Sequence, residues 1–260
     1  MFLPRIIPVL LLKDKGLVKT VKFKKPRYIG DPINAVKIFN DLKADELIFL
    51  DITASKENRC LSTEIIKDIG DEAFMPFGVG GGISKVEQIE QLLKAGAEKA
   101  IINTQAVKNP QLIEEATKIF GSQSIVVSID IKKSLFGKYQ VWINDGSENT
   151  KKNPVELAKQ AEEFGAGEII INSIDFDGMM TGYDIKLLKS IANEVTVPVV
   201  ACGGAGNLEH LKKAYYEGNA HALAAGSLFV FHGSRRAVLI NYPSKIEIRQ
   251  ILKENGYNYD

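Results

Sequence analysis

The chain has 260 residues and a formal net charge of +1, with 45% hydrophobic and 25% charged residues. These values are typical of a soluble globular protein, and so small a net charge gives no reason to expect binding to nucleic acid or to a membrane. Two cysteines are too few for a disulfide framework, no cysteine or histidine spacing predicts a metal site, and no apolar run reaches the roughly 18 residues of a membrane span. We therefore expect a cytoplasmic protein without a metal or another cofactor.

Short apolar runs alternate with amphipathic stretches along the chain. Nearly continuous apolar runs are typical of strands buried on both faces of a parallel sheet, and they predict strands at residues 5–11, 46–51, 75–79, 99–103, 125–130, 168–173, 198–202 and 221–225. The amphipathic stretches predict helices at residues 32–43, 59–70, 85–95, 110–119, 154–164, 184–194, 207–217 and 245–255. Strict alternation of eight strands with eight helices predicts a single (β/α)8 barrel, a TIM barrel, over residues 1–260, and a doubly wound open sheet is the alternative.

Two insertions interrupt this alternation. Residues 15–30 are rich in lysine, and within them residues 15–25 are expected to form a basic loop that is either mobile and able to close over a phosphorylated ligand or simply solvated. Residues 132–150 predict a small hairpin with an Asn-Asp-Gly turn at 144–146. Because both insertions follow strands, we expect them on the C-terminal face of the barrel, where such barrels keep their active sites.

The two halves of the chain repeat each other about 122 residues apart. The sequence Val-Gly-Gly-Gly at 79–82 returns as Cys-Gly-Gly-Ala at 202–205. A repeat of this length favours a barrel built from two duplicated half-barrels, at about residues 1–122 and 123–245, because two equal halves of four units each close naturally into one barrel.

Glycines and short polar side chains follow strands at matching places in the two halves. Backbone N–H groups beside glycines can approach an anion closely, and a hydroxyl or amide side chain completes such a site. Either set taken alone is also compatible with a mere turn, but two sets at one spacing predict a ligand with a phosphate at each end. The predicted phosphate-binding residues are Gly82, Asn103 and Thr104 in the first half, and Gly203, Gly204, Gly226 and Ser227 in the second.

Carboxylates lie at or just after the ends of several predicted strands. The strand at 125–130 ends in Asp130, whereas its counterpart in the first half ends in Leu11. A carboxylate at the mouth can act as a general acid or base, which makes Asp130 the best candidate for a catalytic residue. Asp177 and Gly178 predict a turn that also holds ligand. The alternative for each acid is that it caps a loop.

Four charged residues stand at the opposite ends of the strands. Arg5, Glu46, Lys99 and Glu168 each fall at a strand start, which is the bottom of a barrel. Charges of balanced sign there predict a ring of salt bridges. Such a ring either caps the core or forms a gate through which a small polar molecule enters from below.

These motifs together resemble those of the cyclase subunit of imidazole glycerol phosphate synthase, the HisF family. The similarity extends over essentially the whole chain and is carried by residues 5–7, 30–32, 46–55, 79–83, 102–104, 120–123, 165–168 and 203–206. The resemblance implies a (β/α)8 barrel that receives ammonia from a HisH-like glutaminase subunit docked on its N-terminal face. The ammonia would cross the barrel and react with a phosphoribulosyl-formimino aminoimidazole carboxamide ribotide, which gives imidazole glycerol phosphate and aminoimidazole carboxamide ribotide.

The resemblance also assigns roles to residues. It implies that the four charged residues at the strand starts form the ammonia gate. The two sets of glycines and polar residues would be the phosphate sites, with Asp177 in the second, and Asp130 would be one of two catalytic acids. The other acid should end the first strand, where this chain has Leu11. Loss of an acid or base typically costs about 10²–10⁴-fold in rate, so cyclisation should be weak or absent. Phe176 and Met179 stand where the family usually has an arginine and a threonine.

Residues 6–13 and 17–26 resemble a divergent branch of the family, found with surface-polysaccharide genes. The resemblance implies a subunit that supplies ammonia to a separate sugar amidotransferase, which converts an acetamido group into an acetamidino group. One alternative is a working cyclase of histidine biosynthesis. Another is a scaffold that activates a glutaminase without conducting ammonia.

Overall fold

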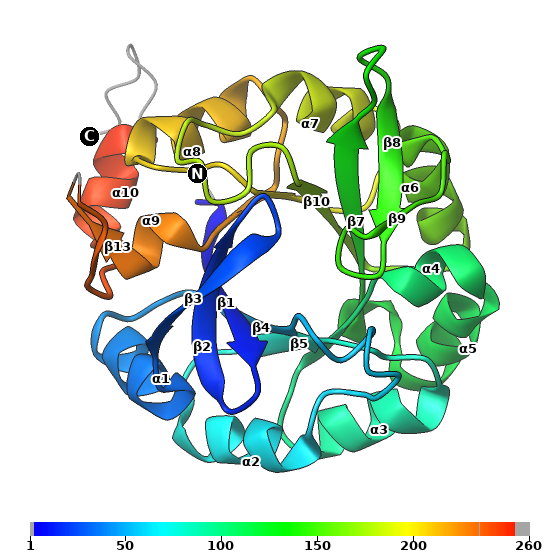
Figure 1. Ribbon diagram of the computed structural model, residues 1–260, viewed down its shortest axis with the longest axis horizontal. Helices are drawn as coiled ribbons and strands as arrows, with labels where there is room; N and C mark the ends of the chain where they lie inside the picture. The colour runs from blue at the N-terminus through cyan, green and yellow to red at the C-terminus, as the bar shows by residue number, and fades with distance from the viewer. Residues whose placement is uncertain (1–2, 234, 253–260) are drawn as a thin grey trace.

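The computed structural model describes residues 3–233 and 235–252, which form a closed ring of parallel strands with helices around it (Figure 1). The strands of the ring, in spatial order, are β1 (Arg5–Lys13), β4 (Leu47–Asp51), β5 (Phe77–Gly80), β6 (Lys99–Ile102), β7 (Ile125–Lys133), β10 (Glu168–Ser173), β11 (Val199–Cys202) and β12 (Ala222–Ala225). Pairing of β12 with β1 closes the ring. Closure excludes the open sheet, so the prediction of a (β/α)8 barrel is confirmed.

The long helices lie outside the ring, at or near the predicted positions. They are α1 (Pro32–Asp41), α2 (Thr63–Glu72), α3 (Val86–Lys94), α5 (Gln111–Phe120), α6 (Pro154–Glu163), α7 (Ile185–Ala192), α8 (Leu208–Tyr216) and α10 (Lys245–Ile251). The repeat is visible in how two of them start. Asp31 accepts the Asn34 N–H before α1, and Asn153 accepts the Val155 N–H before α6, each with proline next in the chain. Within the described residues, no helix is long and apolar enough to cross a membrane.

Some helices differ from the prediction. Helix α2 begins at Thr63 rather than near residue 59, because the Leu61 N–H donates to the Gly81 carbonyl (3.0 Å) and holds the preceding loop. Two short helices, α4 (Thr104–Lys108) and α9 (Ser227–Val230), are additional and directly follow β6 and β12. A single 3-10 turn, η1 (Ser122–Ser124), precedes β7. The additional helices begin at two residues predicted to hold phosphate, Thr104 and Ser227.

The insertion after β1 is a two-stranded hairpin, so the expectation of a loop there is wrong. Strand β2 (Gly16–Val21) pairs antiparallel with the end of β1 and with β3 (Lys24–Gly30). Its residues from Leu17 to Thr20 are buried, including the side chain of Lys19. This lysine-rich segment therefore contains a strand whose side chains are partly buried.

The insertion after β7 is the predicted hairpin. Strand β8 (Tyr139–Ile143) pairs with the end of β7 and with β9 (Glu148–Asn149). The turn at Asn144, Asp145 and Gly146 has positive φ angles of 51°, 56° and 67°, which asparagine, aspartate and glycine tolerate best. Near the end of the described chain, β13 (Phe231–His232) and β14 (Ala237–Val238) form a separate two-stranded sheet.

The barrel interior is filled in layers, because alternate residues of a strand face the same side. The bottom layer holds the four charged residues, Arg5, Glu46, Lys99 and Glu168. Two residues further along each strand is an apolar layer of buried isoleucines, Ile7, Ile48, Ile101 and Ile170. Two residues beyond these, the floor of the mouth is made by Val9, Leu50, Asn103 and Asn172. An apolar plug thus separates the bottom charges from the mouth.

Candidate active site at the barrel mouth

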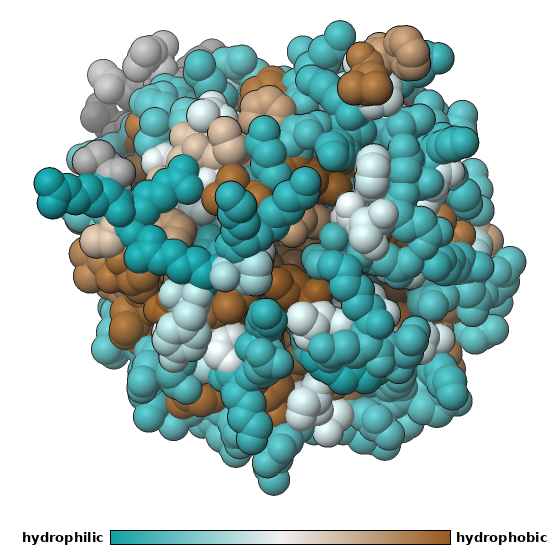
Figure 2. Space-filling model, in the orientation of Figure 1, coloured by the Kyte–Doolittle hydropathy of each residue, from teal (hydrophilic) through white to brown (hydrophobic). Residues whose placement is uncertain are grey.

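The carboxyl ends of the strands surround a cavity of about 340 Å³. Figure 2 shows this face of the molecule, with hydrophobic residues exposed in the middle and polar side chains around them. All of the residues predicted for the mouth line this cavity, namely Gly82, Asn103, Thr104, Asp130, Asp177, Gly178, Gly203, Gly204, Gly226 and Ser227. Their spatial convergence agrees with the sequence analysis, and their individual roles stay predictions. Among the described residues, no cluster of histidine, cysteine, aspartate or glutamate could hold a metal ion.

Asp130 lies at the cavity wall with both carboxylate oxygens hydrogen-bonded to amides. Oδ1 accepts from Asn172 Nδ2 and Oδ2 from Asn103 Nδ2, both at 3.1 Å. Burial raises the pKa of Asp130 from its ordinary 3.8 to about 7, the Asn172 amide lowers it in part, and the charges of Asp145 and Asp177 raise it further. A carboxyl group with a pKa near 7 can accept or donate a proton at neutral pH, as a general acid or base must.

The strand register places Leu11 at the position equivalent to Asp130. Leu11 is opposite Leu50 across β1 and β4, and Asp130 is opposite Asn172 across β7 and β10. Leu50 and Asn172 are themselves equivalent in the repeat. Leu11 is 8% exposed and packs with the apolar residues of the barrel interior. One wall of the mouth therefore carries a carboxylate and an amide, and the facing wall carries two leucines.

The glycine loops have a geometry that only glycine allows. Gly82 has a φ of +65°, and a Cβ there would lie 1.8 Å from the Arg59 carbonyl oxygen. Gly204 has a φ of +124°, and its Cβ would lie 2.1 Å from the Gly182 carbonyl oxygen. Beside the second loop, the Ser227 hydroxyl is buried without a hydrogen-bond partner among the described residues. A hydroxyl without a partner beside a glycine loop and a lysine is compatible with an oxyanion ligand.

The hairpin after β1 is tied to the loop after β10 through Asp177. Lys19 Nζ lies 3.0 Å from Asp177 Oδ1, the Thr20 hydroxyl donates to Oδ2 at 3.1 Å, and the Lys22 N–H donates to the Asp177 carbonyl at 2.9 Å. A Cβ on Gly226 would lie 3.1 Å from Lys19 Nζ, so the ammonium group is beside the second glycine loop. The site therefore contains a buried cation that the sequence analysis missed.

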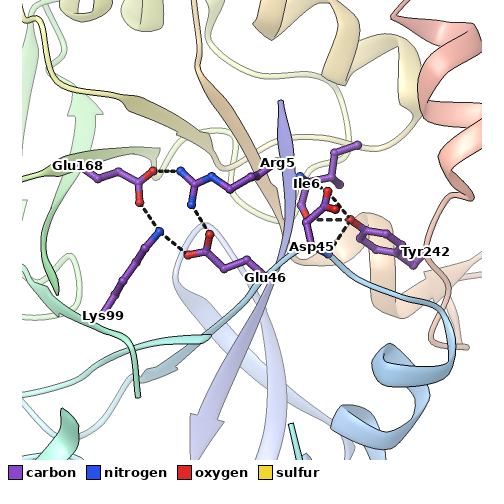
Figure 3. A network of polar contacts seen from close by, with 7 residues as sticks. All are labelled: Arg5, Ile6, Asp45, Glu46, Lys99, Glu168 and Tyr242. Atoms are coloured by element: carbon purple, nitrogen blue, oxygen red, sulfur yellow. Dashed lines mark hydrogen bonds and ion pairs between the residues drawn. The ribbon is translucent and has the colours of Figure 1, made fainter. Parts of the chain in front are cut away.

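The predicted ring of charges is present at the bottom of the barrel. Arg5 donates to Glu46 with one nitrogen and to Glu168 with the other, and Lys99 Nζ lies 2.8 Å from Glu46 and 2.9 Å from Glu168 (Figure 3). Both carboxylates thus bridge both cations, which closes the ring. Beside it, the Tyr242 hydroxyl donates to the Ile6 carbonyl at 2.9 Å and holds the C-terminal segment against β1.

Comparison with known proteins relates this chain to one family. The model of a family described as histidine biosynthesis protein matches residues 5–234. A Pseudomonas aeruginosa protein, provisionally named as imidazole glycerol phosphate synthase subunit hisF2, is 51% identical over 239 residues, which is 92% of this chain and 95% of the relative. The imidazole glycerol phosphate synthase subunit HisF of a Hydrogenobaculum species is 47% identical over 256 residues, 98% of each chain.

The chain belongs to the HisF family. The resemblance inferred from the motifs is thereby confirmed at the level of the family. The narrower resemblance of residues 6–13 and 17–26 to the branch that serves sugar amidination stays a prediction.

Three residues of this HisF-type mouth lay outside the sequence analysis. Lys19 looked like one lysine among many in a basic insertion. Arg59 lines the cavity and donates to Asp51 at 2.5 Å, while Asp51 also accepts the Thr53 N–H and so caps its loop. Asn172 is the penultimate residue of an apolar run and was not singled out for that reason. The repeat did contain a signal, because position 172 has an amide where the equivalent position in the first half has Leu50.

Proposed function

We propose that this HisF-type chain is the synthase subunit of a glutamine amidotransferase, with a HisH-like glutaminase on the bottom face as the source of its ammonia. In this proposal the chain passes ammonia through the barrel and has little or no cyclase activity. A separate sugar amidotransferase uses the ammonia to form an acetamidino group. The observation that carries the proposal is that Leu11 occupies the position equivalent to Asp130 on the facing wall of the mouth, while both glycine loops are present. A cyclisation that needs several proton transfers has only one of two expected acids in this cavity.

The bottom face supports docking of a partner around the charge ring. Helices of a (β/α)8 barrel run antiparallel to the strands, so their C-terminal ends lie on the same face as the ring. Three hydrophobic side chains are exposed at or just after such ends, Phe74 (89%), Ile119 (63%) and Leu42 (37%). Large apolar side chains exposed on one face favour a protein partner there. A glutaminase in that position would release ammonia directly below the ring.

The barrel interior supports passage of a small neutral molecule. Ammonia has to leave the ring as an uncharged species, because the isoleucine layer above it offers no polar atom to an ammonium ion. The side chains of the ring differ in exposure from 36% for Arg5 to 3% for Glu46. Rearrangement of the more exposed cations is therefore the simplest way for the ring to open.

A working imidazole glycerol phosphate synthase cyclase is the second candidate. It is favoured by Asp130, whose pKa near 7 suits acid–base chemistry, and by both glycine loops. The test is turnover of phosphoribulosyl-formimino aminoimidazole carboxamide ribotide with ammonium salt by the isolated chain. We expect a rate at least about 10²-fold below that of a HisF enzyme with both acids. A rate within about tenfold of that enzyme would refute the proposal.

The variant Leu11→Asp sharpens this test. It restores a carboxylate at the equivalent position, and it should raise any residual cyclisation only if the remaining groups of the mouth are competent. A matched control is Leu135→Asp at the tip of the β7–β8 hairpin, where the side chain is fully exposed. The control should leave the cyclisation rate unchanged.

A variant in the charge ring distinguishes conduction of ammonia from the scaffold alternative. Lys99→Leu in the complex with the glutaminase should uncouple glutamine use from product, because it blocks or distorts the entrance without touching the exposed apolar side chains around it. Unchanged coupling would favour a scaffold that activates the glutaminase without conducting ammonia.

A further inference from the structure

An ion pair joins the turn between β8 and β9 to the loop after β4 at the mouth. Lys56 Nζ lies 2.8 Å from Asp145 Oδ2, and the two segments meet on the mouth side of the barrel (Figure 1). Asp145 lines the cavity and its side chain is 20% exposed, whereas the side chain of Lys56 is 51% exposed. The carboxylate of this pair therefore belongs to the cavity, and the ammonium group belongs to its rim.

The ion pair adjoins the first glycine loop from two sides. The loop that carries Lys56 packs on Gly82, where an added Cβ would lie 3.2 Å from the Ala54 carbonyl carbon. On the other side, the N–H of Asn144, in the same turn as the carboxylate, donates to the Thr104 hydroxyl at 3.2 Å. An oxyanion held by Gly82 and Thr104 would therefore lie beside the ion pair.

Two other cations line this half of the cavity, and both have acid partners. Arg59 donates to Asp51 at 2.5 Å and to Glu57 at 2.6 Å, and Asp51 also caps its loop. Lys108 Nζ lies 3.1 Å from Glu148. Among the described residues, each of these cations near the first loop is thus already paired. An anion bound there must take its counter-charge from an existing pair.

The pair with Asp145 is the easiest one for such an anion to break. Burial raises the pKa of Asp145, the ammonium group of Lys56 lowers it in part, and the charge of Asp177 raises it further. Asp130 lines the same cavity. A phosphate would thus add its charge to a space that several carboxylates already share, and like charges at close range repel. Its arrival therefore weakens the hold of Asp145 on Lys56.

We propose that Lys56 is a phosphate-binding residue of the first glycine loop, kept in place by Asp145 and transferred to the ligand when a phosphate group enters. The carboxylate keeps the ammonium group at the rim until a stronger anion competes for it. A doubly charged phosphate offers three acceptor oxygens to Lys56, and its charge repels Asp145. The exchange selects dianionic end groups, because a singly charged anion gains little by replacing a carboxylate.

This inference goes beyond the proposed function. It rests on the predicted phosphate site at the first glycine loop and does not depend on where the ammonia goes.

The experiment is a titration of the isolated chain with inorganic phosphate at constant ionic strength, with sodium chloride as the balancing salt. The backbone amide resonances of Gly82 and Gly204 in ¹H–¹⁵N correlation spectra report on the two glycine loops separately. Asp145→Asn should raise the phosphate affinity at Gly82 at least about fivefold, because it removes a competing charge and frees Lys56. Asparagine tolerates the φ of 56° at this position, so the turn keeps its conformation.

The decisive comparison is Lys56→Met in the parent chain and in Asp145→Asn. If the lysine binds the phosphate, its loss weakens binding at Gly82 at least about fivefold in both backgrounds. Lys56→Arg keeps a cation with N–H donors and should retain most of the affinity. A double variant that binds phosphate as tightly as Asp145→Asn would overturn the proposal, because the lysine would then only neutralise the carboxylate.

The matched control is the exposed ion pair of Lys118 and Glu114 on α5, which lies outside the cavity lining. Lys118→Met and Glu114→Gln should leave phosphate binding at both loops unchanged. The lack of a saturable shift at Gly82 in both the parent chain and Asp145→Asn would also overturn the proposal.

The outcomes separate this inference from the proposed function. Failure of phosphate binding at the first loop removes the role of Lys56 but leaves the supply of ammonia to a sugar amidotransferase open. Phosphate binding that depends on Lys56, together with a normal cyclisation rate, refutes the proposed function and keeps the phosphate-binding role of this lysine.

Discussion

Replacement of Asp130 by asparagine should stabilise the protein at high pH and have almost no effect at low pH. Asp130 is buried, and its pKa is raised from 3.8 to about 7. Near pH 4 and below, the carboxyl group is protonated in the folded and the unfolded chain alike. Between about pH 4 and about pH 7 the unfolded chain has lost this proton and the folded chain still holds it, so the free energy of unfolding falls as the pH rises. Above about pH 7 this contribution is constant.

The pKa change sets the size of the effect. One pKa unit corresponds to about 1.4 kcal/mol, so the ionised carboxylate destabilises the folded chain by about 4 kcal/mol at pH 8. The asparagine NH2 group would face one of the two amides that now donate to Asp130. Asn172 can turn its unpartnered Oδ1 towards that NH2 group, so this mismatch offsets little of the gain. We expect Asp130→Asn to gain about 2–4 kcal/mol at pH 8 and less than about 1 kcal/mol near pH 4.

Urea denaturation of both proteins at a series of pH values between about 4 and 8 measures this difference. Asp68→Asn, on the exposed side of α2, is a matched control and should change the free energy of unfolding by less than about 0.5 kcal/mol throughout. A difference between parent and Asp130→Asn that is the same at every pH, or a loss of stability at pH 8, would refute the reasoning that burial dominates at Asp130.

Two further predictions concern the bottom ring and the first glycine loop. Lys99→Met leaves the buried carboxylates of Glu46 and Glu168 with Arg5 as their remaining partner in the ring, and it should lower the free energy of unfolding by about 3 kcal/mol in urea denaturation. Lys94→Met removes an exposed ion pair with Glu90 and should cost less than about 0.5 kcal/mol; equal losses would contradict a buried ring. Gly82→Ala should abolish inorganic phosphate binding at the first loop in calorimetry and destabilise by more than about 2 kcal/mol, because its Cβ would collide with the Arg59 carbonyl. Gly137 also has a positive φ, but a Cβ there would meet no atom within 4 Å, so Gly137→Ala is the control and should keep phosphate binding. Phosphate binding retained in both variants would argue against a phosphate site at the first glycine loop.

The strand pattern predicted the barrel because parallel strands leave a strong local trace. Their apolar runs and the helices between them depend on residues close in the chain, and the repeat fixed which strand ends correspond. The equivalence of Leu11 and Asp130 could therefore be predicted, and the register of β1 with β4 and of β7 with β10 confirms it. The ring of Arg5, Glu46, Lys99 and Glu168 could be predicted for the same reason, because position along a strand decides which end of the barrel a residue occupies.

The remaining features depend on residues that are far apart in the chain. Lys19 and Asp177 are 158 positions apart, and nothing near Lys19 in the sequence distinguishes it from the exposed lysines of the same insertion. The pKa of Asp130 and the unpartnered oxygen of Asn172 arise from burial and from side chains on other strands. The sequence by itself thus determined the barrel, its two ends and the equivalence of Leu11 with Asp130, since these follow from local pattern and repeat. Only the tertiary structure decided which polar groups meet at the mouth and which one is left unpaired, because hydrogen bonding and burial are set by the closed ring of strands as a whole.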